Sequence, residues 1–115
     1  MMVMNKLDIT FSALSDPTRR AILGRLALGE ATAGELAEPF KISQPAISRH
    51  LRVLEEASLI VRERRGQHRI CRLDPRPLER ADEWLEFYRR FWNEAVDRLD
   101  RHLKQKERRT YDRDR

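Results

Sequence analysis

The chain has 115 residues, 40% of them hydrophobic and 37% charged, which suits one globular domain with a modest core and a highly charged surface. Its 24 Lys and Arg against 19 Asp and Glu give a net charge of +5, which favours a polyanionic partner. No apolar run approaches the roughly 18 residues of a membrane span, and the N-terminal stretch lacks the apolar core of a signal peptide. A single cysteine excludes an internal disulfide and suits a reducing compartment. We therefore expect a cytoplasmic protein without a membrane partner.

Two short helices are predicted near the start. Leu7, Phe11 and Leu14 recur at helical spacing and predict a first helix over residues 7–14. A second helix is expected to begin at Asp16 and Pro17, an N-cap aspartate followed by a proline at the first helical position. Its inward side chains are expected to be Ile22, Leu23 and Leu26. The arginines on its other surfaces, which we expect to be solvated, are Arg19, Arg20 and Arg25.

The next two helices are predicted to form a helix-turn-helix. Thr32 and Glu35 fit a capping box that opens a third helix, and Pro39 ends that helix early. After a tight turn, Ser43 is a suitable N-cap for a helix over residues 43–57. Its apolar stripe at i, i+4 and i+7, which must pack inward, is Ile47, Leu51 and Leu54.

The opposite face of the helix at 43–57 is short, polar and cationic. It carries Pro45, Ser48, Arg49 and Arg52. Small side chains allow close approach to a DNA groove, and arginine suits guanine or phosphate. The alternatives are a helix face of solvated charges and a winged-helix module that uses the same face to dock a protein.

Residues 60–73 are predicted to form a β-hairpin around a turn at Arg65-Gly66-Gln67. The hairpin holds five arginines and one glutamate, a net charge of +4. Such a basic wing suits contacts with phosphate or the minor groove, whereas the alternative is that its charges only protect an exposed sheet edge. The wing residues that we expect to contact DNA are Arg64, Arg65, Gln67 and Arg69.

A long helix is expected over about residues 78–103, after the break at Asp74-Pro75-Arg76-Pro77. Its apolar and aromatic face is larger than a small head can cover, so the predicted partner is the same helix in a second copy. The expected dimer-interface residues are Leu7, Phe11, Leu78, Ala81, Trp84, Leu85, Tyr88, Phe91, Trp92, Ala95 and Leu99. Phe87 broadens this face further. We call the helix over residues 43–57 the recognition helix, because we expect it to lie in the major groove of DNA. A dimer would place its two recognition helices about 34 Å apart, one turn of DNA.

The expected architecture is mainly α-helical with a small β-hairpin wing: a winged helix-turn-helix, dimeric through its terminal helices. We assign residues 7–75 to the DNA-binding head and residues 76–104 to a dimerisation helix of the same domain. Residues 105–115 are charge-dense and poor in apolar side chains, so we expect them to be disordered.

Three stretches carry a resemblance to a known family. They are ALSDPTRRAIL (13–23), ELAEPFKISQPAISRHLRVLEEASLI (35–60) and WLEFYRRFWNEAVDRLDRHL (84–103). With the basic wing, they make the chain resemble the ArsR/SmtB family of bacterial winged-helix repressors, in a branch without metal sites. The resemblance implies a homodimer that binds an inverted-repeat operator in double-stranded DNA and represses transcription.

The resemblance also implies roles for individual residues. The base-contacting positions would be Gln44, Pro45, Ser48 and Arg49. Ser43 and Arg52 would lie near phosphates, while His50 would either hold a phosphate or pack against the second helix. Relatives commonly carry glycine where this chain has Ser58, so a left-handed backbone there would cost up to about 1 kcal/mol.

We expect no metal, no cofactor and no enzymatic activity. The family's thiolate site would fall on Ala37 and Pro39, which cannot bind metal, and the last helix has a single histidine, His102. No phosphate-binding glycine loop, nucleophile elbow or acid–base cluster is present in the sequence. Two possibilities stay open: a redox role for Cys71, and an unknown small-molecule effector held by aromatic residues at the dimer interface.

Overall fold

The computed structural model describes residues 5–113, with side chains for residues 5–109. The chain divides into two compact units, one up to Ala81 and the other from Asp82 onward. Among the described residues, no helix is long and apolar enough to cross a membrane.

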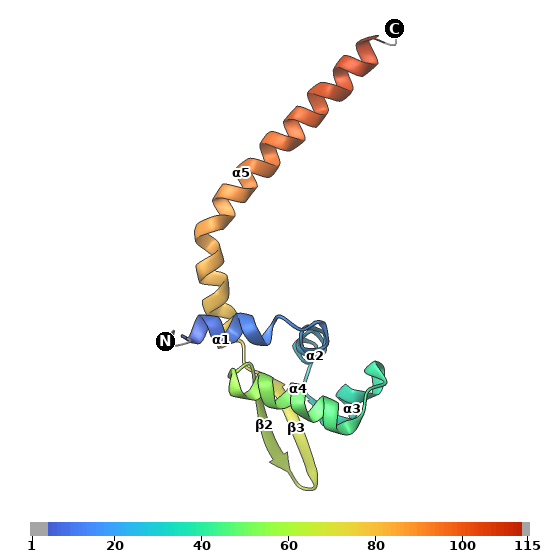
Figure 1. Cartoon of the computed structure of the whole chain (residues 1–115), viewed down its shortest axis with the longest axis vertical. Coiled ribbons are helices and arrows are strands. Elements are labelled where there is room, and N and C mark those ends of the chain that lie inside the picture. Colours follow the sequence, from blue (N-terminus) through green and yellow to red (C-terminus); the bar gives the residue numbers. More distant parts are fainter. Residues whose placement is uncertain (1–4, 114–115) are drawn as a thin grey trace. The chain divides into compact units, whose positions relative to one another are not determined.

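The first unit contains four α-helices, a short 3-10 helix, three strands and the start of a fifth helix (Figure 1). In chain order these elements are α1 (Lys6–Ala13), α2 (Pro17–Ala27), β1 (Ala31–Thr32), α3 (Ala33–Ala37), η1 (Glu38–Phe40), α4 (Gln44–Glu56), β2 (Ile60–Arg65), β3 (His68–Leu73) and α5 (Arg76–Arg113). The predicted winged helix-turn-helix is therefore confirmed, with α3 and α4 as its two helices and β2–β3 as its wing.

The predicted helix caps are present. Asp16 accepts from the backbone N–H of Arg19 at 3.0 Å, and Ser43 accepts from that of Ala46 at 3.3 Å. Thr32 and Glu35 form the reciprocal capping box of α3. Each cap satisfies a backbone donor that has no partner within its own helix, so these helix starts are specified locally by the sequence.

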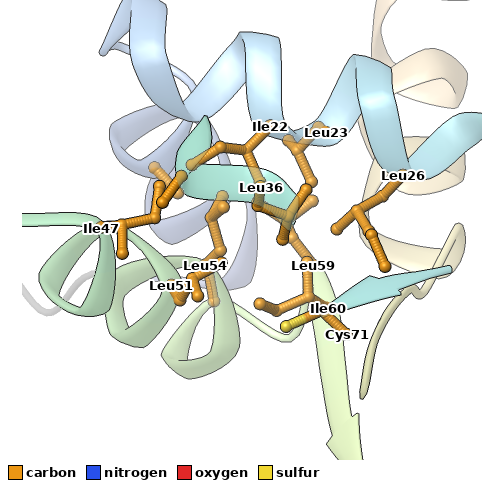
Figure 2. Packing of buried hydrophobic residues seen from close by; sticks show 14 residues of the cluster. Ile22, Leu23, Leu26, Leu36, Ile47, Leu51, Leu54, Leu59, Ile60 and Cys71 are labelled. Atoms are coloured by element: carbon orange, nitrogen blue, oxygen red, sulfur yellow. The ribbon is translucent and has the colours of Figure 1, made fainter. Parts of the chain in front are cut away.

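The core of the first unit lies where α2, α3, α4 and the base of the wing meet (Figure 2). The inward faces of α2 and α4 are the predicted ones, and they supply Ile22, Leu23, Leu26, Ile47, Leu51 and Leu54. Leu36 of α3 and Leu59, Ile60 and Cys71 around the wing complete the cluster. This core fixes α4 by one face and leaves its opposite face at the surface.

The sheet has three antiparallel strands in the order β1-β3-β2, although the sequence predicted only a hairpin. β1 is two residues long and pairs Ala31 with Cys71 and Thr32 with Ile70. So short a strand has no alternating pattern of its own, and it exists through pairing with a distant segment. It anchors the base of the wing to the start of α3.

Helix α5 is longer at both ends than we expected. It begins at Arg76 instead of about residue 78, because a proline in the first turn, here Pro77, costs no helical hydrogen bond. At the other end it continues through residues 105–113, which we expected to belong to a disordered tail. These residues are mostly good helix formers, and Lys104 pairs with Asp100 at 3.1 Å, i to i+4. Residues 114 and 115 lie outside the described part of the chain.

The end of α4 has the geometry of a Schellman motif. The N–H of Leu59 donates to the carbonyl of Leu54 and the N–H of Ser58 to that of Glu55, both at 2.9 Å. This motif needs a left-handed residue, and Ser58 has a φ of 60°. Ser58 therefore meets the condition under which a serine at this position is strained relative to glycine.

Candidate nucleic-acid interface

The outward face of α4 presents a polar and cationic surface. The base-contacting candidates Gln44, Pro45, Ser48 and Arg49 are all exposed, as are Ser43 and Arg52. The opposite face of the helix is completely buried at Ile47, Leu51 and Leu54. A helix that packs on the core by one face, with short side chains and arginine on the other, has the shape and chemistry for insertion into a major groove.

Two arginines of the wing face each other across the hairpin. Arg64 of β2 is paired in register with Arg69 of β3, and both are exposed. Like charges directly opposite one another destabilise a sheet, and within residues 5–109 neither arginine forms an ion pair with a carboxylate. An anion from outside the chain, such as a phosphate, would relieve this repulsion.

Arg64 and Arg69 lie on the same face of the wing as the wing residues that are buried in the core. Side chains alternate along a strand, so Arg64 and Arg69 share a face with Ile60 and the buried Cys71. Arg62 is on the same face, with its Nε 3.8 Å from Glu55 Oε1 of α4. Arg64 and Arg69 therefore project from the side of the hairpin that packs against α4.

Arg65 has a different environment from the other candidates in the wing. It lies on the opposite face and pairs with Glu30, with Nη1 2.5 Å from Oε1, and also with Glu63. These two carboxylates raise the pKa of Arg65 and offset its charge. Gln67 is exposed in the turn, where Gly66 has the positive φ of 61° that such a turn requires. Arg64, Gln67 and Arg69 are thus the wing candidates with the freest access to a polyanion.

His50 packs against the start of α2, which is one of the two roles that the sequence left open. Its side chain is only 22% exposed, and Nδ1 lies 3.9 Å from Oδ2 of Asp16 and 3.5 Å from Nη1 of Arg19. The pKa of Asp16 is lowered, chiefly by the N–H that Arg19 donates to it. We expected Arg19 to be solvated, but it is partly buried and its side chain contacts two other helices, α1 and α4. These contacts come from the fold and give no signal in the sequence.

Cys71 is completely buried, and this burial raises the pKa of its thiol. A protonated, inaccessible thiol is a poor nucleophile, so the environment disfavours the redox role. Within the described residues, no three His, Cys, Asp or Glu side chains are grouped closely enough to hold a metal ion.

The part of α5 in the second unit carries a broad aromatic and aliphatic face. Its most exposed large side chains are Phe87 at 81%, Phe91 at 68% and Val96 at 60%. Other exposed members of this face are Trp84, Tyr88, Trp92, Leu99 and Leu103. Of the remaining interface candidates, Phe11 is 38% exposed on α1, Leu7 is half-buried, and Leu85 and Ala95 are half-buried on α5. Ala81 is buried and Leu78 packs on the core, so these two candidates already serve the first unit.

Comparison with known proteins gives concordant matches. A family model described as a helix-turn-helix domain matches residues 14–63. The chain is 45% identical over 79 residues to the transcriptional repressor SdpR of Bacillus subtilis, and the match covers 69% of this chain and 88% of that protein. It is 43% identical over 89 residues to the HTH-type transcriptional regulator Rv2034 of Mycobacterium tuberculosis, covering 77% and 80%.

A solved structure resembles the chain over a similar length. It is the crystal structure of the ArsR family transcriptional regulator RHA00566, with a TM-score of 0.71 and 38% sequence identity. The superposition covers 77% of this chain and 98% of that one. The matched proteins are thus similar to this chain in sequence and in fold, and each carries the name of a transcriptional regulator or repressor.

Proposed function

Because this chain belongs to the ArsR family of winged helix-turn-helix transcriptional regulators, we propose that it is a repressor that binds an inverted-repeat operator as a homodimer. Its relatives include a named transcriptional repressor, and members of the family are regulators rather than enzymes. The proposed partners are double-stranded DNA and a second copy of the chain, in the cytoplasm, with no metal or cofactor.

The observation that carries the proposal is the exposed polar face of α4. In the proposed complex, α4 lies in the major groove, where Gln44 and Arg49 hydrogen-bond to base edges. Pro45 and Ser48 allow the close approach of the helix, while Ser43 and Arg52 contact phosphates. The net charge of +5 supports attraction to DNA irrespective of sequence.

The wing adds contacts beside the groove. Arg64 and Arg69 approach the flanking backbone or the minor groove, which relieves their mutual repulsion across the hairpin. Gln67 at the turn lies alongside them. Arg65 contributes less, because Glu30 and Glu63 already compensate its charge.

The dimer is proposed to form through the exposed face of α5 together with α1. Burial of the aromatic side chains from Trp84 to Trp92 would remove a large apolar surface from water. A two-fold axis would then give the two copies of α4 a separation of about one DNA turn, which requires an operator with two inverted half-sites.

Selection of bound duplexes from random DNA by the purified protein tests this function. We expect an enriched inverted repeat, bound at least about a thousandfold more tightly than random duplex, with an affinity that falls steeply as salt rises. A winged-helix module that docks a protein would enrich no site and show a shallow salt dependence.

A further inference from the structure

Arg19 joins three parts of the first unit. Its Nε donates to the carbonyl of Ala13 at 2.7 Å and its Nη2 to that of Ser12 at 3.3 Å. Both carbonyls belong to the C-terminal turn of α1, where carbonyl groups lack helical partners and the helix dipole favours a cation. The guanidinium of Arg19, from the first turn of α2, therefore caps the end of α1.

The remaining nitrogen of the same guanidinium reaches the recognition helix. Nη1 of Arg19 lies 3.5 Å from Nδ1 of His50, and a neutral histidine can accept a hydrogen bond at that nitrogen. His50 directly follows Arg49 in the chain, and the same Nδ1 also lies 3.9 Å from Oδ2 of Asp16, the N-cap of α2. A single planar side chain thus connects the end of α1 with the middle of α4.

We propose that Arg19 is a positioning residue for DNA recognition: through His50 it fixes the rotation of α4, and thereby the direction in which Arg49 points. The inference rests on the proposed function of α4. Base contacts depend on geometry within about 0.5 Å and 10–20°, so a small rotation of α4 about its axis would weaken specific binding even though every DNA-contacting side chain remains. Only guanidinium has the fork of donors that serves both helices at once.

Arg20 provides a matched control. Its Nη1 donates to the carbonyl of Leu14 at 2.8 Å, so it caps the same end of α1 from the next position along α2. Among the residues that the structure describes, its hydrogen bonds include none to α4. Loss of Arg20 therefore removes a comparable cap and the same charge without touching His50.

The test compares Arg19→Ala, Arg20→Ala, His50→Ala and the double variant Arg19→Ala/His50→Ala on the operator that wild type selects. We expect Arg19→Ala to weaken specific binding about tenfold and Arg20→Ala less than about twofold, with similar losses of thermal stability. His50→Ala should match Arg19→Ala, and the double variant should lose no more than either single one, since both remove one connection. Should Arg19→Ala fail to fold, Arg19→Lys keeps the charge but lacks the fork, and we expect it to weaken binding in the same way.

Equal losses of specific affinity in Arg19→Ala and Arg20→Ala would overturn the inference. So would losses of affinity that add up in the Arg19→Ala/His50→Ala double variant. A salt slope of binding reduced by about one unit in Arg19→Ala would also overturn it, because that change indicates a direct phosphate contact. A wild-type protein that selects no operator would overturn the proposed function itself. If the wild-type protein selects an operator but Arg19→Ala and Arg20→Ala weaken binding to it equally, only the role of Arg19 is overturned.

Discussion

Two single residues affect the stability of the fold: Ser58 through its backbone conformation and Asp74 through its charge. Ser58 has a left-handed backbone at the end of α4, where the Schellman hydrogen bonds of Ser58 and Leu59 require it. Relative to glycine, a side chain with a Cβ costs up to about 1 kcal/mol at such a position. The end of α4 is therefore less stable with serine at position 58 than it would be with glycine.

We expect Ser58→Gly to raise the free energy of unfolding by about 0.5–1 kcal/mol. Relief of the left-handed strain should exceed the extra entropy that glycine has in the unfolded chain. Chemical denaturation with urea measures the change. Ser58→Ala is the control, because it removes the hydroxyl but keeps the Cβ, and we expect no gain. Equal stability of the glycine and alanine variants would contradict the assignment of strain to this position.

Asp74 stabilises the start of α5 through its charge. Its carboxylate accepts from the backbone N–H of Arg76 at 3.1 Å and from the guanidinium of Arg76 at 2.6 Å. These hydrogen bonds lower the pKa of Asp74 to about 2. Because the pKa is lower in the folded state than in the unfolded state, the stabilisation is complete above about pH 4 and is lost as the pH falls toward 2.

Asp74→Asn should therefore be less stable than wild type at neutral pH, by about 1.5 kcal/mol, while it keeps an acceptor for the N–H of Arg76. The difference in unfolding free energy between the two proteins should shrink between about pH 4 and pH 2. Denaturation at a series of pH values gives this difference directly. A difference that stays constant down to pH 2 would show that the charge of Asp74 contributes nothing.

Among the elements, α4 and the wing present different kinds of exposed side chain, and we propose a separate task in DNA binding for each. The outward face of α4 carries groups whose chemistry suits hydrogen bonds to base edges, such as Gln44 and Arg49, on a helix whose inner face is buried in the core. The wing carries paired cations, Arg64 and Arg69, on the side that packs against α4. Specificity should thus depend mainly on α4, and affinity for any duplex mainly on the wing.

Substitutions in the two elements should have different signatures. Arg49→Ala should relax the preference at one base position by about 1–3 kcal/mol. Arg64→Ala should weaken binding to all duplexes alike and reduce the salt slope by about one unit. Binding of each variant to a panel of single-base operator mutants, at several salt concentrations, separates these effects. An unchanged base preference in Arg49→Ala would rule out a base contact for that residue.

The sequence predicted the elements that are specified locally. The caps at Asp16, Thr32 and Ser43 mark the true starts of α2, α3 and α4, and the apolar stripes give the buried faces of α2 and α4. Strand β1 was missed because it depends on pairing with β3, far along the chain. Residues 105–113 were expected to be disordered because they are poor in apolar side chains, although most of them are good helix formers.

The candidate site was predictable to a similar extent. Exposure of the α4 face follows from helical periodicity, so the candidates on it could be named without a structure. The contacts of Arg19, the compensation of Arg65 and the inward position of His50 depend on tertiary packing, and no local pattern in the sequence encodes them.

In the molecule as a whole, the second unit exposes a large aromatic and aliphatic surface on α5. Aromatic residues cluster along α5, with ring centroids 4.9 Å apart for Trp84 and Tyr88 and 5.0 Å apart for Phe87 and Tyr88. Phe87 and Phe91 are nevertheless largely exposed. Exposed aromatic surface of this kind is characteristic of an interface, which is why we propose that a second copy covers it.

Phe91→Glu should weaken self-association about a hundredfold or more, because each of two symmetric positions loses the burial of a large side chain. Sedimentation equilibrium measures the association constant. Asn93→Glu introduces the same charge two residues away, outside the apolar face, and should leave association unchanged. Equal behaviour of both variants, or a monomeric wild type, would refute the interface.

The most direct test of the central claim, a homodimer that reads two half-sites through α4, is a hydroxyl-radical footprint on the selected operator. We predict two protected segments related by a dyad, with centres about 10–10.5 base pairs apart. One protected segment without two-fold symmetry would contradict the account.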